Sequence, residues 1–293
     1  MTTSIYATLE NLGLTSKKTR VLFNKGTRDV DDLDVWKDLE SGVIYIDQYY
    51  TGDKTYVDGL YLDDVADLAT TKSDFERTSD LRRRFKKYIR FVAGKRVVDF
   101  GCGSGDFLRF VQSYCQEAIG IELQENYVEQ LNADGIRCLN NIDTIKNGSL
   151  DIVVAWHVIE HLTDPVGTLS KLIDKIESGG QIIIEVPHAN DFLLSSIECE
   201  AFKQFTLWSQ HLILHTRLSL TKILEHAGFK DIRIEGVQRY PLSNHLNWLS
   251  SGLPGGHKSQ LAIFETDDLI NSYEASLARI DATDTLVAIA TVP

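Results

Sequence analysis

The chain has 293 residues, of which 43% are hydrophobic and 25% are charged. This balance is typical of a globular protein that buries a sizeable core, and it excludes disordered, collagen-like and coiled-coil chains. The 42 acidic residues outnumber the 30 basic residues, and the resulting net charge of −12 opposes binding to a phosphate backbone. We therefore expect no nucleic-acid partner.

No stretch of the sequence reaches the roughly 18 to 20 uninterrupted apolar residues that a membrane-spanning helix needs. The first residues lack a basic start followed by an apolar run, so we expect a cytoplasmic protein without a secretory leader. The four cysteines form no CxxC pair, which argues against a zinc ribbon or a disulfide framework. We expect free, mostly buried thiols at Cys102, Cys115, Cys138 and Cys199.

Three short β-rich runs lie in the first 50 residues and are separated by turn residues. The runs TRVLF, DLDVWKD and GVIYID predict a small antiparallel element. The following stretch, residues 49–68, is rich in Tyr, Asp and Gly without clear periodicity, and we interpret it as an ordered loop or lid. Residues 1–72 would thus form an N-terminal β-rich element with its lid.

Residues 73–92 carry apolar side chains near helical spacing. This pattern predicts a helix that opens the main domain, residues 73–293. Five basic residues lie between the apolar positions of this helix: Arg82, Arg83, Arg84, Lys86 and Lys87. We interpret them as a solvated helix face rather than a basic binding patch.

From Gly94 onward, β-like and helix-like segments alternate. Predicted strands cover residues 96–100, 118–123, 135–140, 150–158, 179–187, 230–238 and 285–292, and predicted helices cover 107–115, 125–135, 164–176 and 219–229. Strands buried on both faces have continuous Val- and Ile-rich sequences. The predicted fold class is therefore α/β, with a doubly wound, mostly parallel seven-stranded sheet between layers of helices.

A glycine-rich turn, FGCGSGD, joins the first strand of this series to its helix through Gly101, Gly103 and Gly105. Glycines at such a turn let a ligand approach the backbone closely. The dinucleotide pattern GxGxxG would need a further glycine where the chain has Asp106. Asp99, just before the turn, would disfavour an anionic pyrophosphate and would suit a cationic ligand.

An acidic residue followed by GxGxG resembles the first motif of the class I S-adenosylmethionine-dependent methyltransferases, and the resemblance extends over roughly residues 94–291. It implies that S-adenosylmethionine is the cofactor. Glu122, at the end of the second predicted strand, would accept hydrogen bonds from the ribose hydroxyls, and residues 140–143 would bracket the adenine. The expected cofactor-binding residues are Asp99, Gly101, Cys102, Gly103, Gly105, Phe107, Glu122, Leu123, Asn141, Ile142 and Trp156.

The fourth predicted strand leads into HVIEHL, where His157, Glu160 and His161 have the spacing i, i+3 and i+4 and would share one helix face. Ubiquinone-pathway and small-RNA methyltransferases resemble this arrangement and hold a divalent ion with it. Those relatives have a carboxylate where this chain has His157, and hard cations prefer oxygen ligands. We therefore expect no metal, and turnover that survives EDTA, with Glu160 and His161 shaping the pocket floor.

An insertion at about residues 189–214 delays the next helix and would cover the ligand crevice at the carboxyl edge of the sheet. It contains His211 and leads into His215, which is four residues further along and could share a helix face with it. If the acceptor is a hydroxyl group, a base would assist the transfer. The expected catalytic residues are, in order, His161, His211, His157 and His215.

A second insertion, at about residues 239–280, separates the last two predicted strands, which are almost directly connected in simple methyltransferases. It concentrates cationic and aromatic side chains in an acidic chain, which suggests an anionic partner that offers a flat group for stacking. The expected substrate-binding residues are Arg239, Tyr240, His245, Trp248, His257 and Lys258. The alternative is a segment that only packs or forms a homodimer.

These features predict methyl transfer from S-adenosylmethionine to a small polar, anionic acceptor such as a sugar nucleotide or sugar phosphate. The N-terminal β element and the second insertion resemble methyltransferases of bacterial surface-polysaccharide and modified-sugar pathways. Two alternatives differ in class. A nicotinamide-dependent oxidoreductase is disfavoured by Asp99 and Asp106, and a non-catalytic scaffold subunit is disfavoured by the intact glycine turn.

Overall fold

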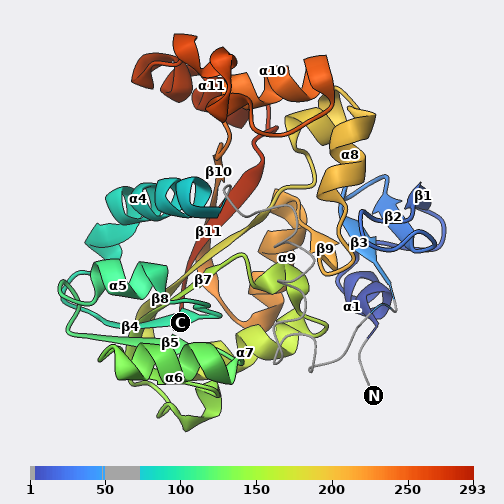
Figure 1. Ribbon diagram of the computed structural model, residues 1–293. Coiled ribbons are helices and arrows are strands. Elements are labelled where there is room, and N and C mark those ends of the chain that lie inside the picture. Colours follow the sequence, from blue (N-terminus) through green and yellow to red (C-terminus); the bar gives the residue numbers. More distant parts are fainter. Residues whose placement is uncertain (1–3, 48, 50–72) are drawn as a thin grey trace.

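The structure is a computed structural model that describes residues 4–47, 49 and 73–293. Two sheets organise this part of the chain (Figure 1). The larger sheet has seven strands in the order β10-β11-β8-β7-β4-β5-β6, and the smaller has four in the order β1-β2-β3-β9. Apart from Tyr49, the predicted lid at residues 49–68 lies outside the described residues.

The seven-stranded sheet confirms the predicted fold class. Strands β4 to β8 pair in parallel, whereas β11 lies antiparallel between β8 and β10. Every strand predicted after residue 94 is present. The strands are β4 (Arg96–Phe100), β5 (Glu117–Ile121), β6 (Cys138–Leu139), β7 (Leu150–Trp156), β8 (Ile176–Pro187), β10 (Lys230–Val237) and β11 (Thr285–Thr291).

Helices cover both faces of this sheet because successive strand residues present their side chains to opposite sides. Val97 belongs to the buried cluster that includes side chains of α4 and α5. Its neighbour Val98 belongs to the cluster that includes side chains of α7 and α9. The helices around the sheet are α4 (Ser73–Val92), α5 (Asp106–Val111), α6 (Glu125–Ala133), α7 (Pro165–Lys175) and α9 (Arg217–Ala227).

The predicted antiparallel N-terminal element is confirmed, with two additions. Its strands β1 (Arg20–Lys25), β2 (Asp34–Asp38) and β3 (Ile44–Ile46) pair antiparallel. A fourth strand, β9 (Ile213–Leu214), pairs with β3 and comes from the predicted insertion at residues 189–214. A short helix, α1 (Ile5–Asn11), precedes the sheet and was missed by the sequence pattern. The first insertion therefore ties the N-terminal element to the main domain.

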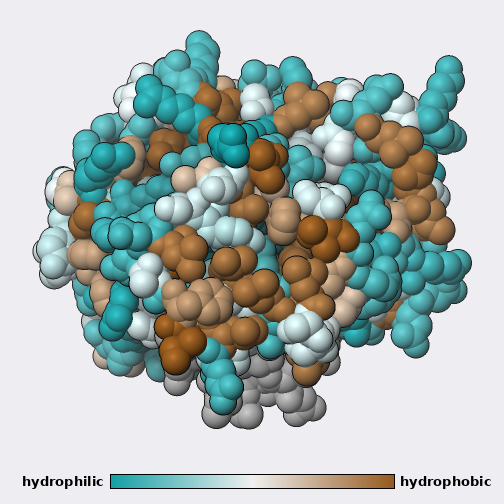
Figure 2. Space-filling view, turned by 90° about the horizontal axis from the view of Figure 1, so that it is seen from above, coloured by the Kyte–Doolittle hydropathy of each residue, from teal (hydrophilic) through white to brown (hydrophobic). Residues whose placement is uncertain are grey.

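Both insertions contain helices. The first contains a π-helix, η3 (Phe192–Ser196), and α8 (Glu200–Thr206), and the second contains α10 (Leu242–Ser251), the 3₁₀ helices η4 (Gly256–Lys258) and η5 (Gln260–Phe264), and α11 (Asp267–Arg279). Figure 2 views the molecule from the side of α10 and α11 and shows apolar side chains gathered among hydrophilic ones. Within the described ranges, no helix combines the length and apolarity needed to cross a bilayer.

Candidate functional site

The glycine turn after β4 has left-handed backbone at all of its glycines, with φ of 73° at Gly101, 53° at Gly103 and 74° at Gly105. A Cβ atom on Gly101 would lie 2.6 Å from the Val158 side chain, and one on Gly105 would lie 2.4 Å from the Leu131 side chain. A Cβ on Gly103 would meet no atom within 4 Å. Two glycines are thus needed for packing, whereas Gly103 faces open space that a ligand could fill.

Glu122 connects this turn to the end of β5. Its Oε2 accepts a hydrogen bond from the Gly103 N–H at 2.8 Å, and its Oε1 accepts from the N–H groups of Leu123 at 2.7 Å and Gln124 at 3.0 Å. The residue is 9% exposed. The predicted ribose acceptor therefore lies directly against the turn, where a carboxylate can reach a ligand seated over Gly103.

Replacing Glu122 with Ala is expected to weaken binding of S-adenosylhomocysteine by about 1–3 kcal/mol, the scale of hydrogen bonds made by a charged group. Calorimetry measures this loss. Glu125, three residues further along and exposed in the first turn of α6, provides the control, and Glu125→Ala should leave the affinity unchanged. A loss below a few tenths of a kcal/mol for Glu122→Ala would place the ribose contact elsewhere.

Asp99 is the last acidic residue before the turn and is buried at 2% exposure. Burial raises the pKa of its carboxyl to about 7, although the positive charge of Arg84 acts to lower this pKa. The Oδ1 atom of Asp99 has no hydrogen-bond partner among the described residues. An unpaired buried carboxylate oxygen is costly, and a cationic ligand beside the turn would relieve that cost.

His157 ends β7 with a φ of 56°, and this conformation stops the helix that the HVIEHL spacing predicts. Only a 3₁₀ turn, η2 (Ile159–His161), follows. The His157 Nδ1 donates to Glu160 Oε1 at 3.1 Å, and its Nε2 lies 3.2 Å from Glu185 Oε1. Burial and the Arg239 charge oppose protonation, but the two carboxylates raise the pKa of His157.

The basic run of α4 is only in part the solvated face that we predicted, because Arg82 and Lys86 are exposed whereas Arg83 and Arg84 are half-buried. The Arg83 and Arg84 guanidinium groups lie 2.9 Å and 2.6 Å from Glu185 Oε1, and the Glu185 side chain is fully buried. Burial alone would raise the pKa of Glu185, yet the two arginines hold it well below its ordinary value. For Arg83 and Arg84 the prediction was wrong, because their partner Glu185, at the carboxyl end of β8, lies about a hundred residues further along the chain.

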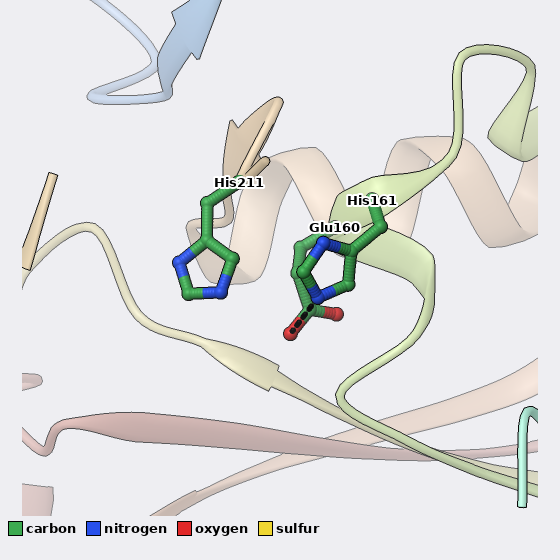
Figure 3. A group of neighbouring side chains, drawn as sticks. All are labelled: Glu160, His161 and His211. Atoms are coloured by element: carbon green, nitrogen blue, oxygen red, sulfur yellow. Dashed lines mark ion pairs between the residues drawn. The ribbon is translucent and has the colours of Figure 1, made fainter. Parts of the chain in front are cut away.

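His161 and His211 lie side by side, with ring centroids 4.9 Å apart, and Figure 3 shows both rings close to the Glu160 carboxylate. The His161 Nδ1 donates to the Gln210 carbonyl at 2.8 Å. The predicted pairing of His211 with His215 on a helix face is wrong, because β9 separates them. His215 is fully buried against Ser219, and burial lowers its pKa to about 4.

A cavity of about 230 Å³ opens beside these histidines. His157 and His211 line one part of it, and side chains of both insertions line much of the rest. Among the residues predicted to bind the acceptor, Arg239, Tyr240, His245 and Trp248 line this cavity. The two insertions and the histidine turns thus meet around a single space.

The sheet and the glycine turn agree with comparisons to known proteins. Residues 72–234, more than half of the chain, match the family described as a methyltransferase domain. The chain belongs to this methyltransferase family. The N-terminal strands β1 to β3 and the second insertion lie outside the matched residues.

Individual relatives of this methyltransferase are distant. A tRNA U34 carboxymethyltransferase of Alteromonas mediterranea is 26% identical over 61% of this chain and 58% of that protein, so the chain spans little more than half of its length. A ubiquinone biosynthesis O-methyltransferase of Burkholderia pseudomallei is 24% identical over 52% of this chain and 72% of that protein. A solved S-adenosylmethionine-dependent methyltransferase from Archaeoglobus fulgidus is 20% identical in sequence. Its match covers 72% of this chain and 92% of the solved chain, with a TM-score of 0.50.

The remaining predicted cofactor residues of the methyltransferase have varied positions. The Phe107 and Trp156 rings pack edge to face in the core behind the turn, with their centroids 5.2 Å apart. Asn141 begins the 3₁₀ helix η1 (Ile142–Thr144), and its side chain accepts from the Asp143 N–H, while Ile142 is buried. Leu123 is half exposed. Contact of these residues with an adenosine group stays a prediction.

All four cysteines are free, as we expected, although only Cys138 is fully buried. The Sγ atoms of Cys102 and Cys138 lie 3.9 Å apart. Cys102, Cys115 and Cys199 are half-buried. No disulfide framework therefore supports the fold.

The cationic cluster predicted in the second insertion is largely neutralised. Arg239 is half-buried and donates to Asp80 of α4 at 3.1 Å, so its charge is paired. His245 donates to or accepts from the Tyr273 hydroxyl at 2.7 Å, and burial lowers its pKa to about 4. His257 lines a neighbouring cavity of about 180 Å³, and Lys258 is exposed on η4. Asp80 neutralises Arg239 from 159 residues earlier in the chain, so the local excess of cationic residues in the sequence did not indicate this pairing.

Two side chains that the sequence analysis missed, Arg28 and Phe202, also line the larger cavity, together with Phe205 of the first insertion. The Arg28 guanidinium stacks over Trp208 at 4.5 Å and over Phe205 at 5.7 Å. Its backbone N–H donates to the Leu207 carbonyl, which holds the β1–β2 loop against the first insertion. No local pattern near residue 28 indicates this role, because the contact depends on chain far ahead in the sequence.

Proposed function

We propose that the protein transfers a methyl group from S-adenosylmethionine to a small polar acceptor that binds in the 230 Å³ cavity. One observation carries this proposal. His157 lines the cavity, while the next residue, Val158, packs against the backbone of Gly101 in the glycine turn. Two adjacent residues thus connect the acceptor cavity with the predicted cofactor site.

The described residues fit the cofactor. Gly103 leaves space above the turn, Glu122 offers carboxylate oxygens, and the unpaired Oδ1 of Asp99 suits positive charge. When bound, S-adenosylmethionine supplies an electrophilic methyl group on a sulfonium. Methyl transfer requires in-line approach, so the main task of the cavity is to orient the acceptor.

The histidines differ in their suitability as bases. His157 is held by two carboxylates that favour its protonated form, which leaves it poorly able to accept a proton. Burial lowers the pKa of His161 and, more strongly, that of His211, so both are neutral near pH 7. We keep His211, which lines the cavity, and His161, whose ring centroid lies 4.9 Å from that of His211, as the groups that act on an acceptor hydroxyl. We place His215 outside the reaction because it is fully buried against Ser219.

The acceptor class that we propose is a sugar nucleotide or sugar phosphate. Aromatic side chains of the cavity, including Tyr240, Trp248 and Phe205, can stack on the apolar face of a sugar or on a base. Arg28 is a cation at the cavity wall.

Three further proposals accompany this acceptor class. They are action within surface-polysaccharide or modified-sugar pathways, a cytoplasmic location and a homodimer. Exposed apolar residues on the α10–α11 side could form a dimer contact: Leu249, Leu253, Ile263, Phe264 and Ile270.

Calorimetry with S-adenosylmethionine, S-adenosylhomocysteine and NAD(P) tests the proposal against the two alternatives. Binding of the first two ligands with no NAD(P) binding is the expected result, and the reverse would identify an oxidoreductase. Methyl transfer is then assayed with sugar nucleotides and sugar phosphates, with unphosphorylated sugars as the comparison. Binding of both adenosyl ligands without transfer to any acceptor would favour the scaffold alternative.

The acceptor cavity is tested by Phe205→Ala, which removes a ring from its wall. We expect the acceptor KM to rise at least about fivefold, because a stacking surface is lost, while the affinity for S-adenosylhomocysteine changes by less than about threefold. Phe110 is similarly exposed, at 43% against 38% for Phe205, but lies on α5 and outside the cavity lining, so Phe110→Ala is the matched control. An unchanged acceptor KM in Phe205→Ala would exclude this cavity as the acceptor site.

A further inference from the structure

Glu160, His161 and His211 converge beside the cavity (Figure 3). Each offers one ligand atom, and these atoms all lie within 4.8 Å of one another. Two of the residues belong to the 3₁₀ turn after β7, and the third comes from the loop that precedes β9. This group differs from the predicted trio, because His211 takes the place of His157.

Hydrogen bonds orient two of the three side chains for a shared ligand, those of His161 and Glu160. The Gln210 carbonyl can only accept, so the His161 Nδ1 carries the hydrogen and the Nε2 lone pair is left on the side of Glu160, 4.0 Å from its Oε1. The Glu160 Oε1 accepts from His157, whereas its Oε2 is buried without a partner among the described residues. The buried Nδ1 of His211 likewise has no partner there.

The chemistry of the three side chains suits metal ligation. Glu160 is fully buried, and His157 occupies only one of its two carboxylate oxygens. The His161 and His211 rings lie beside this carboxylate, with their centroids 4.9 Å apart. A carboxylate and neutral imidazoles are the forms in which these side chains bind metal ions.

We propose that Glu160, His161 and His211 bind one divalent transition-metal ion at the wall of the acceptor cavity. Two imidazoles and one carboxylate favour ions such as Zn²⁺, Fe²⁺, Mn²⁺ or Co²⁺ over Mg²⁺ and Ca²⁺, which prefer oxygen ligands. His157 then orients Glu160 from outside the ligand set, as partners of metal ligands commonly do. This proposal departs from our expectation of a metal-free protein, which considered only the residues of HVIEHL.

The side of the site that faces the cavity would leave coordination positions for an acceptor, because His211 lines that space. A bound divalent ion acts as a Lewis acid that lowers the pKa of a coordinated hydroxyl. This assignment of chemistry rests on the proposed function, whereas binding of the ion does not. The two proposals can therefore fail separately.

Titration of the tag-free 293-residue chain with Co²⁺, after treatment with EDTA and dialysis, tests the site. We expect one equivalent of Co²⁺ to bind with visible absorption bands of a protein-ligated ion, and Zn²⁺ to displace it. His211→Gln and Glu160→Gln should each weaken binding at least about tenfold, the lower end of the loss on removing a group that supports a metal. The exposed His226 of α9 gives the control, since His226→Ala should titrate like the unchanged protein. Circular dichroism of each variant establishes that it is folded.

Absence of Co²⁺ binding by the unchanged protein, or equal affinity in folded His211→Gln and His226→Ala variants, would overturn the proposal. If Glu160→Gln does not fold, His211→Gln alone decides. Calorimetry with S-adenosylhomocysteine on the same samples separates the two proposals. Cofactor binding without Co²⁺ binding would overturn the metal site and leave the proposed function standing. Co²⁺ binding without cofactor binding would overturn the proposed function and leave the metal site standing.

Discussion

Replacing Gly103 with Arg is expected to abolish binding of S-adenosylhomocysteine while the protein stays folded. A Cβ atom at this position meets no atom within 4 Å, so the new side chain enters space that we assign to the cofactor. The φ of 53° is unfavourable for a residue with a Cβ and costs about 1 kcal/mol. Calorimetry should detect no binding at ligand concentrations that saturate the unchanged protein, a loss of at least about a hundredfold, or close to 3 kcal/mol.

Gly148 provides the matched control for this substitution. It also has a left-handed backbone, with a φ of 64°, and a Cβ atom there would likewise meet nothing within 4 Å, but it lies in an exposed turn before β7. Gly148→Arg therefore carries a similar backbone cost without touching the predicted cofactor site. Normal affinity in both variants would remove the glycine turn from cofactor binding, and unfolding of Gly103→Arg alone would show that the turn has a packing role at this position.

Glu185→Ala is expected to reduce the free energy of unfolding by about 3–5 kcal/mol, because removing one partner of a buried ion pair leaves the other charges uncompensated. Glu185 is fully buried and accepts hydrogen bonds from Arg83 and Arg84 of α4. It also lies 3.2 Å from the His157 Nε2. Its loss would therefore loosen α4 from the sheet, and chemical denaturation measures the effect.

The exposed pair of Arg96 and Glu177 gives the comparison. The Glu177 side chain is 45% exposed and lies 2.6 Å from the Arg96 guanidinium. Glu177→Ala should change the free energy of unfolding by no more than about 1 kcal/mol, because solvent screens such pairs. Equal effects of the two substitutions would mean that the Glu185 network contributes no more to stability than a surface ion pair.

The sequence by itself determined the architecture of the main domain. Val- and Ile-rich runs such as those of β7 and β8 are needed wherever a strand is buried on both faces, so the parallel sheet could be predicted from local patterns. The glycine turn could also be predicted from a local pattern. A left-handed backbone and close neighbours at Gly101 and Gly105 exclude a side chain at these positions. These features depend on neighbours within a few residues, and composition and spacing record such neighbours directly.

Only the tertiary structure decided which charged and catalytic side chains meet. Arg239 is paired with Asp80, 159 residues earlier, and this contact replaces part of the predicted cationic cluster with a partly buried ion pair. His157 was expected on a helix, but its left-handed backbone turns it toward Glu185. The Glu160, His161 and His211 group forms because β9 joins the N-terminal sheet and brings its preceding loop over η2. Burial and long-range pairing set the charge of each of these groups, and no spacing along the chain encodes them.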